Sequence, residues 1–81
     1  MKTLAMIKME KNFVAQEKGY PRKPYEKFST THLLRRLDEE ITELKIAIGN
    51  GDLEESKGEC ADVSNIIDYL FEQLANRALQ I

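Results

Sequence analysis

Apolar side chains recur every three or four residues in three stretches of this 81-residue chain, which is the spacing of an amphipathic α-helix. The stretches cover residues 3–17, the segment from the candidate caps at 29–31 to Gly49, and residues 53–76. No stretch shows the alternation that is typical of a strand. The pattern therefore predicts an all-α, three-helix chain that forms a single domain over residues 1–81, near the lower size limit for an independent core.

The second and third stretches each predict a helix with one apolar stripe. Gly49, Asn50 and Gly51 separate them, and Asp52 with Glu55 gives a capping box for the third helix. These signals predict an antiparallel helical hairpin, and packing is expected along the two stripes. The stripes are Leu34, Leu37, Ile41, Leu44 and Ile48 in the second helix, and Cys60, Val63, Ile67, Leu70, Phe71 and Leu74 in the third. In the first helix, the expected apolar face holds Leu4, Met6, Ile7, Met9, Phe13 and Val14.

Charge is distributed unevenly along the chain. Residues 1–36 contain nine Lys/Arg and three Asp/Glu, and residues 37–81 contain three Lys/Arg and eleven Asp/Glu. This asymmetry favours docking of the two halves on each other, or binding of a polyanion between a metal and the basic groups. Two solvated faces of opposite charge are the alternative explanation. The acids argue against nucleic acid as a partner.

A connection at residues 19–25 contains two prolines, which end the first helix. Lys18, Arg22 and Lys23 lie in or beside it, next to two tyrosines, and these residues are candidates for phosphate and base contacts. A solvated loop explains the same composition equally well.

The cysteine content and the absence of long apolar runs bear on location. Cys60 is the single cysteine, so no disulfide forms within the chain. No segment reaches transmembrane length. The sequence therefore predicts a cytoplasmic protein without a membrane partner.

Two pairs of carboxylates lie at matched positions in the second and third helices. Glu40 and Glu43 form the first pair, and Glu59 and Asp62 the second; a spacing of three residues places each pair on one helix face. Four carboxylates gather stably only around a cation, and an oxygen-only set suits Mg²⁺ or Mn²⁺ rather than zinc. Ion pairs with Arg35, Arg36 or Lys57 would be the alternative explanation of these acids.

The order Glu39-Glu40-Ile41-Thr42-Glu43, fifteen residues, then Glu59-Cys60-Ala61-Asp62 resembles the signature of the MazG-type all-α nucleoside triphosphate pyrophosphohydrolases. The resemblance implies Mg²⁺-dependent hydrolysis of a nucleoside triphosphate to the monophosphate and pyrophosphate, as in housecleaning of the nucleotide pool. It implies metal ligation by Glu40, Glu43, Glu59 and Asp62, with Glu39 as the candidate group that activates water.

The resemblance also implies oligomers built on four-helix bundles. A homodimer or homotetramer would complete such a bundle from the three-helix chain. Arg36 is a further candidate for substrate binding, with the basic residues Lys18, Arg22 and Lys23. Asn65 is a candidate for a contact with the sugar or base of the substrate, although an exposed position on the helix is the simpler expectation for it. The alternative function is a non-catalytic helical interaction module whose acidic residues lie on the surface.

Overall fold

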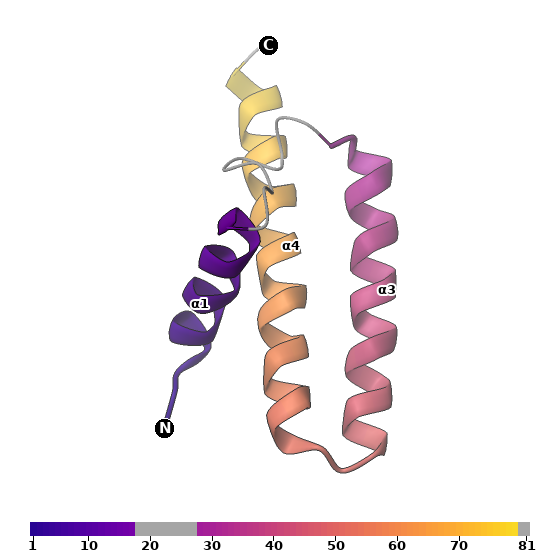
Figure 1. Cartoon of the computed structure of the whole chain (residues 1–81). Helices are drawn as coiled ribbons and strands as arrows, with labels where there is room; N and C mark the ends of the chain where they lie inside the picture. Colours follow the sequence, from indigo (N-terminus) through magenta and orange to yellow (C-terminus); the bar gives the residue numbers. More distant parts are fainter. Residues whose placement is uncertain (18–27, 80–81) are drawn as a thin grey trace.

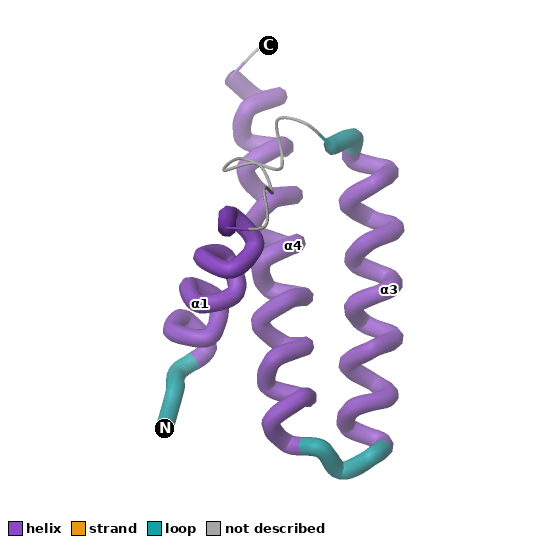
Figure 2. Tube along the Cα trace, in the orientation of Figure 1, coloured by secondary structure: helices purple, strands orange, loops and turns teal. Residues whose placement is uncertain are grey.

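The computed structural model describes residues 1–17 and 28–79, and it is helical almost throughout them. Helix α1 spans Leu4–Glu17, α3 spans Thr30–Gly49 and α4 spans Leu53–Leu79. Figure 1 shows α4 between the other two helices, and Figure 2 shows short loops as the remaining described backbone. The predicted all-α class and the three helices are confirmed, with no strand among the described residues.

The turn between α3 and α4 forms as its residues predict. Gly51 has a φ of +73°, a left-handed conformation that glycine adopts without strain. The Asn50 N–H donates to the Ile46 carbonyl, which closes the end of α3. Asp52 Oδ1 accepts from the Glu55 N–H at 3.0 Å and caps the start of α4. The two helices therefore run back antiparallel, side by side, which confirms the predicted hairpin (Figure 1).

The other end of the hairpin is joined by polar side chains. Gln73 of α4 is 9 % exposed, and its Nε2 donates to the Phe28 carbonyl at 2.7 Å. Thr30 donates from Oγ1 to Gln73 Oε1 at 2.5 Å, and Arg77 donates to Thr30 Oγ1 at 2.5 Å. These bonds fix the start of α3 on the last turns of α4.

Helix α1 packs on α4 through its polar side. Lys8 pairs with Asp68 at 2.5 Å, and Asn12 accepts a hydrogen bond from the Tyr69 hydroxyl at 2.8 Å. The predicted apolar face of this helix is therefore not the face that packs on α4, because the facing side of α4 carries acids and amides that bind polar partners. The exposed apolar residues of α1 are Leu4, Met6, Met9, Phe13 and Val14.

The hairpin buries a different row of side chains from the one that the apolar stripes predict. Leu33, Glu40 and Ala47 are the buried residues of α3, and they recur every seven positions. Leu34 and Ile48, the ends of the predicted stripe, are 49 % and 62 % exposed. On α4, the buried apolar residues are Ala61 and Ile66, whereas Ile67, Phe71 and Leu74 are exposed.

This rotation gives the hairpin two unlike sides. A helix advances about 100° per residue, so in α3 the apolar stripe and Glu43 lie on opposite sides of the buried row. One side of the hairpin is therefore apolar and is not covered by any of the described helices, and the other side holds acids and faces α1. Among the described residues, no helix has the length and apolar character needed to cross a membrane.

Candidate metal centre

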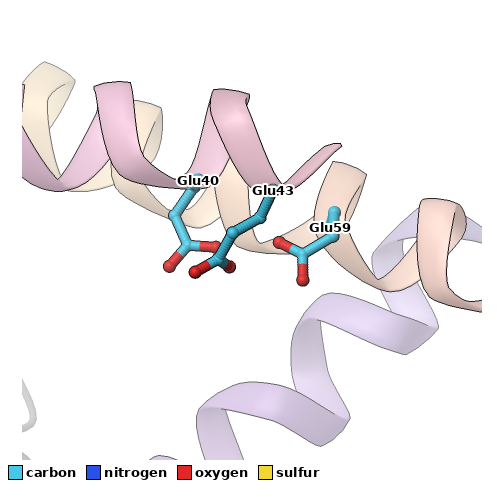
Figure 3. A group of neighbouring side chains, drawn as sticks. All are labelled: Glu40, Glu43 and Glu59. Carbon is cyan, nitrogen blue, oxygen red and sulfur yellow. The ribbon is translucent and has the colours of Figure 1, made fainter. Parts of the chain in front are cut away.

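Three glutamates from two helices converge on the acidic side of the hairpin. Glu40 and Glu43 are one turn apart on α3, and Glu59 comes from the facing α4. One carboxylate oxygen from each lies within 4.8 Å of the other two, a spacing that a single cation can span. Figure 3 shows the three carboxyl groups directed into the same space, on the side where α1 passes.

Two of these carboxyls are buried without adequate hydrogen-bond donors. Glu40 is 6 % exposed and Glu59 is 7 % exposed. Oε2 of each is buried and has no hydrogen-bond partner. A buried carboxylate oxygen without a hydrogen-bond donor costs several kcal/mol, so these two oxygens favour a proton or a cation at this place.

The same burial shifts the protonation equilibria. Burial is the main cause that raises the pKa of Glu59 to about 8, and the neighbouring carboxyl groups of Glu40, Glu55 and Asp62 raise it further. Burial is also the main cause of the raised pKa of Glu40, to which Glu43 and the charge of Asp62 contribute, whereas the neighbouring Glu59 carboxyl lowers it. Without a cation, a proton on Glu59 therefore reduces the negative charge of the site near neutral pH.

Asp62, the predicted fourth ligand, lies beside the three glutamates but outside the group whose oxygens converge. Its Oδ2 accepts from Lys11 Nζ at 3.1 Å. Its charge nevertheless acts on both Glu40 and Glu59. The helical spacing placed Asp62 correctly near the site, but it could not reveal that a lysine from α1 is bound to it.

Arg36 is positioned on the α3 side of the cluster. Its Nη1 donates to Glu39 at 2.6 Å and its Nη2 donates to Glu40 at 2.9 Å. The ion-pair explanation of the acids is thus correct for Glu39 and for one oxygen of Glu40. It leaves Oε2 of Glu40 and Oε2 of Glu59 without a partner, so it does not account for the cluster as a whole.

The remaining predicted residues differ in what the structure says of them. Asn65 is 6 % exposed, so the expectation of an exposed helix position is wrong: α1 packs over it, and Asn12 Nδ2 donates to Asn65 Oδ1 at 3.4 Å. Lys18, Arg22 and Lys23 lie outside the described residues. Lys11, which the sequence reasoning did not select, is the added basic residue of the site.

The donor set fits a hard divalent cation. All three converging atoms are carboxylate oxygens, the ligands that Mg²⁺ and Mn²⁺ prefer, and two of them belong to side chains that need a cation or a proton. Sulfur and imidazole ligands are absent from this group. The buried acidic cluster can therefore bind a metal of this class.

Comparison with known proteins gives one match. A family model described as phosphoribosyl-ATP pyrophosphohydrolase matches residues 6–74, a range that includes most of α1 and α4 and all of α3. It supports the pyrophosphohydrolase part of the resemblance drawn from the sequence, without singling out the MazG type. No curated protein and no solved structure gave a significant match.

Proposed function

Since the chain belongs to the phosphoribosyl-ATP pyrophosphohydrolase family, we propose that it is a divalent-metal-dependent enzyme that hydrolyses a nucleotide triphosphate group to the monophosphate and pyrophosphate. The family has a pyrophosphohydrolase-type function. The observation that carries the proposal is the pair of buried glutamate oxygens without partners, Oε2 of Glu40 and Oε2 of Glu59. Phosphoribosyl-ATP and free nucleoside triphosphates share the triphosphate group and are the two candidate substrates.

In this proposal, Glu40, Glu43 and Glu59 hold Mg²⁺ or Mn²⁺, and Asp62 becomes the fourth ligand. A bound cation of this kind neutralises phosphate charge and lowers the pKa of a coordinated water. Glu39 lies next to Glu40, is half exposed and serves as the proton acceptor for the attacking water.

The chain's own cations and amides have supporting tasks. Arg36 holds Glu39 and Glu40 in fixed orientations through its two donors. Asn65, one turn beyond Asp62, takes part in a buried amide pair with Asn12, and this pair shapes the α1 side of the site where a nucleoside would lie. Lys18, Arg22 and Lys23 remain candidates for phosphate binding.

The experiment is product analysis by ³¹P NMR with phosphoribosyl-ATP and a panel of nucleoside triphosphates, in the presence of Mg²⁺. We expect monophosphate and pyrophosphate in equal amounts. Orthophosphate as the first product, or no turnover of any triphosphate, would contradict the proposal and favour a non-catalytic helical module.

We also propose that a second copy of the chain covers the apolar side of the hairpin and completes a four-helix bundle, in a homodimer or a homotetramer. The support is the uncovered row of Ile67, Phe71 and Leu74 on α4, beside Leu34 and Ile48 on α3. Exposed large apolar side chains on one side of a hairpin favour an interface with another chain.

A charged substitution in this row tests the oligomer. Phe71 is 68 % exposed in the single chain, so a Phe71→Glu variant loses few contacts within the subunit. We expect the wild type to be an oligomer and this variant to be a monomer in light scattering after size-exclusion chromatography. A monomeric wild type would contradict the proposed assembly.

The lone cysteine is consistent with a cytoplasmic setting for the enzyme.

A further inference from the structure

Lys11 brings a positive charge from α1 to the edge of the carboxylate cluster. Its Nζ lies 3.1 Å from Asp62 Oδ2, and the two side chains are 37 % and 29 % exposed, so the ammonium group is within reach of solvent. Asp62 follows Glu59 by one turn of α4, and its charge is felt by both buried glutamates. The ammonium therefore lies where a ligand bound to the cluster would pass.

The end of the Lys11 side chain also runs along the backbone of α4. A Cβ placed on Gly58 would lie 3.6 Å from Lys11 Cε and 3.7 Å from Nζ. Gly58 directly precedes Glu59 in the sequence. Lys11 thus contacts α4 at Gly58 and at Asp62, the positions one before and three after Glu59.

Docking of α1 does not by itself explain a lysine at this place. One turn earlier, Lys8 pairs with Asp68 at 2.5 Å and joins the same two helices. Asp68 lies two turns of α4 further from Glu59 than Asp62 does, outside the converging glutamates. The two lysines share a helix and a type of contact, and they differ in their distance from the site.

We propose that Lys11 is a phosphate-positioning residue, whose ammonium is held by Asp62 in the free protein and donates to the β- or γ-phosphate of the bound nucleotide. The inference rests on the proposed function, because it takes the carboxylate cluster as the place where the triphosphate binds. A lysine ammonium has three donors on a flexible stem, so it can follow a phosphate group without a fixed bidentate geometry. It would supply positive charge on the α4 side, as Arg36 does on the α3 side.

The test is isothermal titration with α,β-methylene-ATP and Mg²⁺, a probe that resists cleavage at the bond concerned, and with AMP as the ligand that lacks the outer phosphates. A charge-assisted hydrogen bond predicts that Lys11→Met weakens binding of the triphosphate probe by at least about tenfold. The affinity for AMP should change by less than about twofold, since that ligand does not reach Lys11. Lys11→Arg should retain most of the affinity.

Lys8→Met is the matched control, because it removes the other α1–α4 ion pair and leaves the site lysine in place. We expect it to bind both ligands as the wild type does. Unchanged affinity of Lys11→Met for the triphosphate probe, or an equal loss for both ligands, would overturn the proposal and reduce Lys11 to a docking residue. A wild type that binds no Mg²⁺–triphosphate probe and hydrolyses neither candidate substrate would instead overturn the proposed function, and the inference with it.

Discussion

Replacing Glu59 by glutamine should remove a pH dependence of stability from the metal-free protein. Its carboxyl pKa rises from 4.5 in the free side chain to about 8 in the fold. A raised carboxyl pKa means that the folded protein keeps a proton that the unfolded chain releases. This group therefore lowers stability as pH rises from about 4.5 to about 8, and has no effect below that window. Linkage with these two values gives a loss of about 2 kcal/mol between about pH 6 and about pH 8.

The glutamine in Glu59→Gln carries no titrating proton, so the variant should not show this loss. For a chain of this size, about 2 kcal/mol corresponds to about 10 °C in Tm. The assay is thermal unfolding followed by circular dichroism in EDTA, at the two pH values and one fixed protein concentration. We expect the wild type to lose about 10 °C relative to the variant over this range.

The control is Glu54→Gln, which removes a glutamate from the same helix where the side chain is 89 % exposed. It should follow the wild type, because no buried charge is changed. Parallel pH dependences for the wild type and Glu59→Gln would refute the reasoning, since the burial of Glu59 would then carry no energetic cost. A variant less stable than the wild type at the higher pH would refute it as well.

Three further predictions concern the metal, the helix backbone and the hairpin end. Mg²⁺ or Mn²⁺ should raise the Tm of the wild type, and its binding should release protons near neutral pH because the carboxyl ligands must be deprotonated. Titration calorimetry in two buffers of different ionisation enthalpy measures the proton release. Equal binding heats in the two buffers would contradict it. Gly58→Ala should stabilise the protein by about 0.5–1 kcal/mol, because the new Cβ meets only the end of Lys11 at ordinary contact distance. Gly51→Ala should destabilise the protein, because the backbone φ at this position is positive. Urea unfolding compares the two variants, and equal changes in the free energy of unfolding would contradict this expectation. Gln73→Ala should cost about 1–3 kcal/mol, because it removes the hydrogen bonds of Gln73 with the Phe28 carbonyl and with the Thr30 hydroxyl. A loss below about 0.5 kcal/mol in the same assay would argue against this role.

Local signals predicted most of the fold. The helix periodicity, the Gly51 turn and the Asp52 cap depend on neighbouring residues, and all three are found in the structure. The convergence of Glu40, Glu43 and Glu59 was also within reach, because helical spacing and an antiparallel hairpin together place them on one side. A hairpin with a short turn leaves few alternatives for the relative register of its helices.

The features that the sequence did not predict depend on which face of each helix packs against the other helices. The apolar stripe of α3 resembled a packing seam, but the hairpin buries most deeply the row that contains Glu40, and the stripe is left half-buried, with its ends Leu34 and Ile48 exposed. The burial of Asn65 and the Lys11–Asp62 pair depend on α1 presenting its polar side to α4. Periodicity defines the faces of a helix and does not choose among their partners.

Pyrophosphate release at saturating Mg²⁺ decides whether the glutamate cluster acts as the metal centre of a pyrophosphohydrolase. The comparison is between wild type, Glu59→Gln and the exposed control Glu54→Gln, with phosphoribosyl-ATP and nucleoside triphosphates as substrates. We expect release by the wild type and the control, and a loss of at least about a hundredfold in Glu59→Gln, because charge stabilisation of the transition state is removed. Equal release by all three proteins would contradict it, because the cluster would then have no part in the reaction.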